Sequence, residues 1–174
     1  FAWGFTLALT LAVAVLSVVA IRREGSWTQE PLVDSAAFHA DALRMKHAFE
    51  QRGASGFVES WFTVNRTHAP LVPALSALTM LVFGESRLAA ESVLLFFVFL
   101  FLLSTLRAVE ILYGWKTAAA TAALTATFPA FVNLARAYLY EMPFAAVVLA
   151  GCWALLRSEG FSRRLPTVLT GVCG

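Results

Sequence analysis

Most apolar positions of this chain are gathered into long runs. The first run, residues 1–21, carries no charged side chain and is long enough for one bilayer crossing, which takes about 20 residues. Further runs at 92–112, 117–135 and 139–156 predict more spans, and a run at 165–174 opens another. We therefore expect an all-α integral membrane protein, built as a multi-span helical bundle.

A long polar stretch separates the first run from the second. Residues 22–68 carry too many charged side chains to lie in hydrocarbon. Within this stretch, residues 35–51 show the mixed apolar and charged pattern of an amphipathic helix. Asp34 or Ser35 can cap its start and Gly53 can end it. The pattern predicts a long first loop that bears amphipathic and interfacial helices.

The apolar run at residues 70–83 decides the predicted topology. A helix of this length reaches about 21 Å, which is short of the ~30 Å hydrocarbon core. We expect it to lie at the membrane interface or to enter and leave on one side, with Gly84 breaking it. The first loop then extends over residues 22–91.

The basic residues orient the predicted bundle. The short segments 114–116 and 157–164 fall on one side of it, and the second contains three arginines against one glutamate. Short basic loops belong in the cytoplasm, so the loop 22–91 and the turn 136–142 are expected outside. The lysines and arginines of the long loop count against this orientation, although long translocated segments follow the rule poorly.

Composition agrees with a membrane protein and excludes some partners. Hydrophobic residues make up 59% of the chain, charged residues 14%, and the mean hydropathy is +0.73, whereas soluble domains carry about 25% charged residues. A net charge of +2 gives no nucleic-acid surface. Neither the histidines nor the cysteines, Cys152 and Cys173, show metal-ligand spacing. The absence of Met at Phe1 and the short run at 165–174 suggest the N-terminal part of a larger protein.

Three segments, in this order and on one predicted membrane face, resemble those of a known family. They are Val33–His39 (VDSAAFH), the proline-led run from His68 to Ser86 that ends in FGES, and Tyr138–Pro143 (YLYEMP). Together they resemble the GT-C membrane glycosyltransferases, most closely the branch of dolichyl-phosphate-mannose mannosyltransferases, aminoarabinose transferases and RgtA-like enzymes. The resemblance covers about residues 5–160 and implies that residues 1–174 form the N-terminal part of one GT-C-type transmembrane domain.

The resemblance implies an activity and a catalytic residue. Family members take a sugar from a polyprenyl-phosphate donor in the bilayer and pass it to a lipid, glycan or protein acceptor outside, which implies a multi-pass protein of a bacterial inner (plasma) membrane. Asp34 matches the family's candidate catalytic base, and Ser35 follows it where the family often has a second acid. Ala69 stands where the family often has a first proline. The candidate substrate-binding residues are His39, Asp41, Arg66, His68, Arg136 and Glu141.

The chemistry of these residue types fits such a transfer. A carboxylate such as Asp34 can take the proton of the acceptor hydroxyl. Arg66, His68 and Arg136 are predicted outside, where cations stabilise the charge that develops on a leaving phosphate. Asp34 and Asp41 lie two helical turns apart and can share a face. No cofactor is fixed by the sequence, and a divalent metal held by carboxylates stays open.

Each candidate also has a simpler structural explanation. Asp34 can be only a helix cap, Asp41 a solvated helix residue, and Glu141 a negative group favoured at a helix start. His39, His68 and the arginines can be interfacial polar groups. Two other functions stay open: a transporter or flippase, which the absence of ionisable residues well inside a span disfavours, and a non-catalytic membrane subunit.

Overall fold

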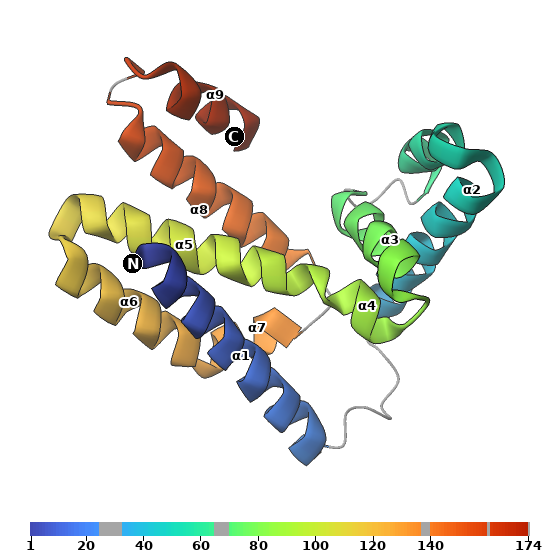
Figure 1. The fold of residues 1–174 in the computed structure, drawn as a ribbon, viewed down its shortest axis with the longest axis horizontal. Coiled ribbons are helices and arrows are strands. Elements are labelled where there is room, and N and C mark those ends of the chain that lie inside the picture. The colour runs from blue at the N-terminus through green and yellow to red at the C-terminus, as the bar shows by residue number, and fades with distance from the viewer. Residues whose placement is uncertain (25–32, 65–69, 137–139, 160, 174) are drawn as a thin grey trace. The chain divides into compact units, whose positions relative to one another are not determined.

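A computed structural model shows a helical protein (Figure 1), and the residues that it describes contain no strand. The described residues are 1–24, 33–64, 70–136, 140–159 and 161–173, without the side chains of 20–24, 33–35 and 136. The helices are α1 (Ala2–Glu24), α2 (Val33–Thr63), α3 (Leu71–Phe83), α4 (Arg87–Glu91), α5 (Val93–Tyr113), α6 (Trp115–Thr127), α7 (Pro129–Arg136), α8 (Glu141–Arg157) and α9 (Arg164–Cys173). The predicted all-α class is confirmed.

Two helices of the described chain are long and apolar enough to cross a membrane. One is α1, in which the window Ala2–Val19 qualifies, and the other is the continuous stretch Arg87–Tyr113 that joins α4 to α5. Both agree with predicted spans. Helix α1 exposes many large apolar side chains, as a lipid-facing helix does: Trp3, Leu7, Leu11, Val15, Leu16, Val18 and Val19. This supports a membrane protein.

The span predicted at residues 117–135 corresponds to two helices and not to one continuous helix. The chain bends by 68° between α6 and α7, and the pair is either a broken span or a re-entrant loop. The break lies at Phe128, whose backbone is extended (φ −71°, ψ 125°), directly before Pro129. Proline disfavours the helical conformation in the residue before it and cannot donate a backbone hydrogen bond. The chain therefore restarts a helix at Pro129, where the missing N–H costs nothing.

The spans predicted at 139–156 and 165–174 are not confirmed. The helices there, α8 and α9, are 17 and 10 residues long, and neither is among the described helices that qualify for a crossing. The described chain holds two candidate spans, or three if the bent α6–α7 pair counts as one.

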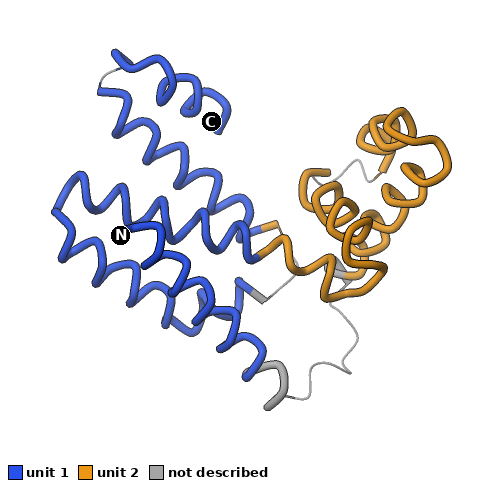
Figure 2. Tube along the Cα trace, viewed as in Figure 1, with its two compact units in different colours: residues 1–27, 95–136, 141–174 blue, residues 28–94, 137–140 orange. Residues whose placement is uncertain are grey.

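The chain divides into two compact units, drawn in different colours in Figure 2. Unit 1 comprises residues 1–27, 95–136 and 141–174, and unit 2 comprises residues 28–94 and 137–140. Unit 1 holds both α1 and almost all of α5, so it contains most of the candidate membrane helices. Unit 2 holds α2, α3 and α4, which arise from the predicted first loop.

Small side chains let α6 pack closely in unit 1. Ala118, Ala122 and Ala126 lie on one face of the helix and are fully or almost fully buried. The first two belong to a cluster with Leu106 of α5 and Ala2 of α1. The hydroxyls of Thr121, Thr125 and Thr127 bond to carbonyls of the same helix. This agrees with the close helix packing that small residues allow in membranes.

Glycine also permits a close approach between α8 and α9. A Cβ atom built at Gly151 would lie 2.9 Å from Cβ of Cys173. We expect Gly151→Leu to push α9 away from α8 and to raise the rate at which Cys173 reacts with N-ethylmaleimide several-fold. Mass spectrometry of the peptide that contains Cys173, in a Cys152→Ser background, measures this rate.

The matched control for that experiment is Gly171→Leu. No atom lies within 4 Å of a Cβ built at Gly171, although it is on the same helix as Cys173. Equal labelling rates in the two variants would show that the α8–α9 contact does not depend on the missing side chain.

A reversal inside α2 shapes unit 2. Gly53 has φ 66° and ψ −150°, a conformation that is essentially restricted to glycine, and it divides α2 into two helical segments. The predicted helix end at Gly53 is therefore confirmed, while helical structure resumes through Thr63. Phe57 and Trp61 of the second segment pack against a cluster that contains Met45 of the first.

The short apolar helix α3 packs on α2 through one face. Val72 and Met80 of α3 are buried with Phe38 and Ala42 of α2. Fully burying an apolar side chain of this size contributes about 1.5–3 kcal/mol. The outer face of α3 carries exposed apolar groups, among them Leu78 and Val82. The predicted apolar helix and its end at Gly84 (φ 86°) are confirmed, and at 13 residues it is too short to qualify as a span.

Candidate functional site

The predicted catalytic residue lies at the beginning of α2. The helix is described from Val33, so Asp34 and Ser35 stand inside its first turn. The sequence predicts that the helix starts at Ser35 with Asp34 or Ser35 as its cap. The helix starts two residues earlier, so neither residue is its N-cap. A carboxylate in the first turn is favoured by the partial positive charge of the helix N-terminus, so the acid fits this position as well as a cap.

His39 lies one turn further along α2 and has an unsatisfied polar atom. Its Nδ1 atom is buried and has no hydrogen-bond partner among the described residues. The large majority of buried side-chain polar atoms have a partner, so an unpaired imidazole nitrogen calls for an explanation. A polar group of a bound ligand could form the missing hydrogen bond with Nδ1 of His39.

Asp41 is buried and paired, and not solvated. It is 3% exposed, and its Oδ1 accepts a hydrogen bond of 3.1 Å from Nη1 of Arg44 one turn later. The guanidinium of Arg44 remains mostly exposed. The pair compensates the buried charge of Asp41, which gives this carboxylate a structural role within α2.

Glu141 begins α8, as the sequence predicts for a negative group at a helix start. Its Oε2 atom is buried and, like Nδ1 of His39, has no partner among the described residues. The other such atoms in the described chain are the Ser104 hydroxyl and the Trp153 indole nitrogen. Two of the three predicted site residues with described side chains thus carry an unsatisfied buried atom.

The residue before Glu141 packs on α2. The ring of Tyr140 lies 6.5 Å from the ring of Phe38, centroid to centroid, and both residues belong to unit 2. Phe38 precedes His39 in α2 and is 2% exposed. The aromatic pair therefore joins the end of the 136–142 turn to the helix that carries His39 and Asp41.

The side chains of the three predicted cationic residues lie outside the part of the chain that the structure describes. Arg66 and His68 lie outside the described residues, and Arg136 ends α7 with its side chain outside them. The same holds for the side chain of Asp34.

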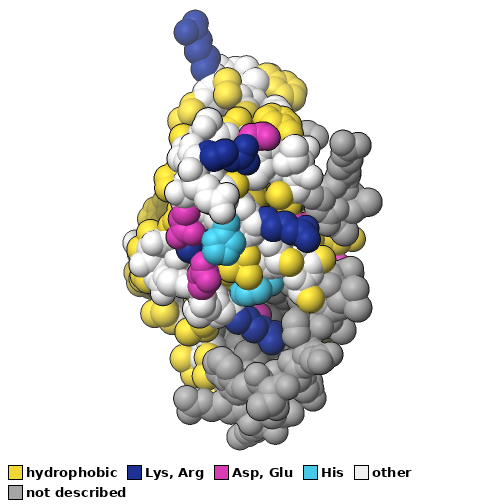
Figure 3. Space-filling view, turned by 90° about the vertical axis from the view of Figure 1, so that its right-hand side faces the viewer, with side chains coloured by type: hydrophobic (Ala, Val, Ile, Leu, Met, Phe, Trp, Pro, Cys, Tyr) yellow, Lys and Arg dark blue, Asp and Glu magenta, His cyan; other side chains and the backbone are white. Residues whose placement is uncertain are grey.

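A second group of polar side chains, which the sequence reasoning did not select, forms an ionic cluster in unit 2. We use this name for Lys46, His47 and Glu50 of α2 with Glu85 of the bend between α3 and α4. Nζ of Lys46 donates to Oε1 of Glu50 and, at 2.8 Å, to Oε1 of Glu85. The Lys46 side chain is only 8% exposed. Figure 3 shows acidic, basic and histidine side chains gathered on one face among apolar ones.

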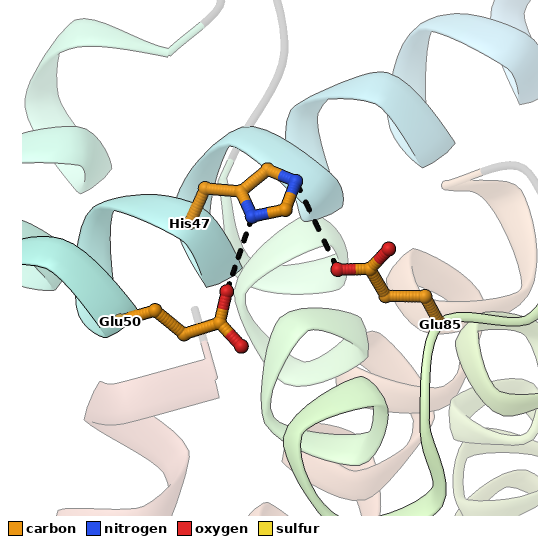
Figure 4. Close-up of side chains that lie close together, drawn as sticks. All are labelled: His47, Glu50 and Glu85. Atoms are coloured by element: carbon orange, nitrogen blue, oxygen red, sulfur yellow. Dashed lines mark hydrogen bonds and ion pairs between the residues drawn. The ribbon is translucent and has the colours of Figure 1, made fainter.

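His47 lies between the two carboxylates of the ionic cluster (Figure 4). Its Nδ1 is 3.1 Å from Oε2 of Glu50, and its Nε2 is 3.8 Å from Oε1 of Glu85. All three of these side chains are about half exposed. The cluster connects α2 to the bend after α3 through the nearly buried Lys46 and through the half-exposed His47.

The hydrogen bonds of the ionic cluster shift the pKa of Lys46, Glu50 and Glu85 toward the charged form of each. The hydrogen bond from Lys46 lowers the pKa of Glu50 and that of Glu85 below the ordinary carboxyl value. The hydrogen bond to Glu50 raises the pKa of Lys46. Because the folded carboxyl pKa values are lowered, the stabilisation is present above the ordinary carboxyl value and is lost as pH falls through the lowered values. Both carboxylates are therefore ionised at neutral pH.

Part of the ionic cluster has a signal in the sequence. His47 and Glu50 are three apart on the predicted helix 35–51, and Lys46 and Glu50 are four apart, so each pair meets on one helix face. Glu85 is 39 residues from Lys46, and only the packing of α3 on α2 brings it to the cluster.

Comparison with known proteins gives no match to this chain. No family model, no curated protein and no solved structure aligns with it significantly.

Proposed function

We propose that this protein is a membrane glycosyltransferase of the GT-C kind, which transfers a sugar from a polyprenyl-phosphate-linked donor to an acceptor on the extracytoplasmic face. The acceptor is a lipid, a glycan or a protein. The proposal rests on the resemblance of the three sequence segments, together with the charged helix α2, which lies in the chain between the candidate spans α1 and Arg87–Tyr113.

The observation that carries this proposal is the ring pair of Phe38 and Tyr140. Under the proposal, Asp34 and Glu141 work on the same side of the membrane. Tyr140 directly precedes Glu141, and its ring packs on Phe38 of α2, the residue before His39. This supports the proposal that the first loop and the 136–142 turn lie on the same side of the membrane. Helix α3 lies between α2 and the candidate span Arg87–Tyr113 and is too short to qualify as a crossing. This favours the same arrangement.

The proposed chemistry assigns a role to each group. Asp34 takes the proton of the acceptor hydroxyl as the anomeric carbon is attacked. Arg66, His68 and Arg136 stabilise the negative charge on the leaving polyprenyl phosphate. The unpaired Nδ1 of His39 is suited to a hydrogen bond with the sugar or the phosphate, and the unpaired Oε2 of Glu141 can accept one from a sugar hydroxyl. The donor is a lipid, so the protein has to lie in a membrane, and the resemblance leads us to place it in a bacterial inner membrane as a multi-pass protein.

One observation favours a second function, a polytopic transporter or flippase. The bent pair α6–α7 has the form of a discontinuous membrane helix, which transporters use to build their binding sites. The ionisable groups of α5 argue against it, since Arg107 and Glu110 lie toward its end and pair with each other at 2.8 Å.

A transfer assay separates the two functions. The full-length protein is reconstituted in liposomes with radiolabelled polyprenyl-phosphate sugars and a lipid extract as acceptor. We expect loss of the lipid-linked donor, release of polyprenyl phosphate and a labelled acceptor. Movement of the label across the membrane with its bond to the polyprenyl phosphate intact would overturn the proposal in favour of the flippase.

A further inference from the structure

The ionic cluster of unit 2 contains three side chains that can bind a metal ion. One nitrogen of His47 and one oxygen from each of Glu50 and Glu85 lie within 4.8 Å of one another. Figure 4 shows the imidazole between the two carboxylates, two of the groups from one turn of α2 and the third from the bend after α3. Such a set is distinct from the predicted transfer residues.

The backbone around these three groups is firmly set. His47 and Glu50 are three residues apart on α2, which places both on one face. Gly84, at φ 86°, ends α3, and its N–H bonds to the carbonyl of Met80. The Ser86 hydroxyl accepts from the backbone N–H of Ala89 and caps α4. Glu85 is therefore held between two helix ends, against the packed surface of α2.

The donor set determines which ions it suits. One imidazole nitrogen and two carboxylate oxygens match the preference of Zn²⁺ and neighbouring first-row divalent ions, whereas Mg²⁺ and Ca²⁺ prefer oxygen alone. We propose that His47, Glu50 and Glu85 form a binding site for a divalent transition-metal ion of the Zn²⁺ type, with water completing the coordination.

The distances require only small side-chain movements. In a tetrahedral zinc site with bonds of ~2.1 Å, two ligand atoms lie about 3.4 Å apart. One ligand atom from each of the three residues lies within 4.8 Å of the others. The short contacts of His47 use different ring nitrogens, Nδ1 to Glu50 at 3.1 Å and Nε2 to Glu85 at 3.8 Å, so one carboxylate has to turn toward the nitrogen that binds the ion. Because the three side chains are about half exposed, they can rotate toward one ion without disturbing the core.

The ammonium group of Lys46 competes with a metal ion for the two carboxylates, and this competition can be tested by substitution. Its ammonium group bonds to both carboxylates, so it is a built-in cation at the place that the metal would use. Metal binding must displace this ammonium group, which lowers the affinity. Removal of the charge at Lys46 frees both carboxylates and raises the affinity.

Calorimetric titration with Zn²⁺ alone tests the site in the full-length protein, held in detergent micelles after treatment with a chelator. We expect His47→Gln and Glu85→Gln each to weaken one binding event by about tenfold or more. Lys46→Met strengthens the same event. The matched control is Glu59→Gln, on the same helix as Glu50 and exposed, where binding stays as in the unmodified protein.

Cobalt absorption gives an independent measure. Co²⁺ bound at this site shows the intense visible bands of four-coordination, and these bands are lost in His47→Gln. Circular dichroism of each variant establishes that it is folded. Zinc binding that is equal in His47→Gln, Glu85→Gln and Glu59→Gln would overturn the proposal, as would the absence of any stoichiometric binding in Lys46→Met. The result does not depend on sugar transfer, because no step of the assay involves donor or acceptor.

Discussion

Replacing Asp34 by Asn abolishes sugar transfer by the full-length protein and leaves its helical content unchanged, if the proposed function is correct. The amide has nearly the same shape as the carboxylate but cannot take a proton from the acceptor hydroxyl. Loss of a general base lowers the rate by about 10²–10⁴-fold. Asn and Asp have nearly equal helix propensities, so the first turn of α2 should form as before.

The measurement is the initial rate of labelled acceptor formation, with circular dichroism on the same preparation. Glu59→Gln serves as the control, because it removes a carboxylate from the exposed second segment of α2 that pairs with Arg52. Its rate should match that of the unmodified protein. Normal transfer by Asp34→Asn would remove this residue from the mechanism, and an equal loss in Glu59→Gln would show a general effect of charge on unit 2.

Local sequence signals predict most of the helices. The apolar runs at 1–21 and 92–112 correspond to α1 and α5, because a continuous apolar run is recognised without information from distant residues. Gly53 and Gly84 both mark real helix breaks, since each adopts a positive φ that other residues avoid. These features depend on the chain's own conformational preferences.

The break at Phe128 shows where such reasoning stops. Pro129 lies inside an apolar run, and membrane helices often contain proline without losing their direction, so the pattern alone does not distinguish a kink from a break. The structure places a 68° bend there. Packing decides the outcome: Phe131 of α7 contacts Phe101 of α5 at 5.2 Å between ring centroids, and the sequence does not encode that pairing locally.

The candidate sites differ in the same way. Glu141 at the start of α8 follows from its place before Pro143 at the head of an apolar run. The burial of Asp41 does not follow from the pattern, because its surroundings are set by how α2 packs. The ionic cluster is the clearest case, since its fourth member, Glu85, reaches it only through the packing of α3 on α2.

Gly56→Ala should disrupt the reversal of α2 more strongly than any other exchange of glycine for alanine that the structure describes. A Cβ atom at Gly56 would lie 2.3 Å from the carbonyl oxygen of Ala48 and 2.8 Å from Cβ of Arg52. The first of these contacts is with backbone, which cannot rotate away. The two segments of α2 must then separate, and the contact of Phe57 with Phe49 is lost.

We expect a cost of about 3 kcal/mol, at the upper end for overpacking, because the whole second segment has to move. Trp61 and Phe57 would leave the cluster around Met45, Ala74 and Ala77, which exposes apolar surface. Limited trypsin digestion reports this directly as faster cleavage at Arg52, and thermal unfolding followed by circular dichroism gives the loss of stability.

Gly4→Ala provides the matched comparison. Gly4 lies within α1, and no atom is found within 4 Å of a Cβ built there, so the same substitution meets open space. Alanine favours a helix by about 1 kcal/mol over glycine, so this variant should be as stable as the unmodified protein or more so. If Gly56→Ala unfolds and is cleaved like Gly4→Ala, then the two segments of α2 do not approach each other closely. In that case the packing that positions the ionic cluster and His39 would have to be different.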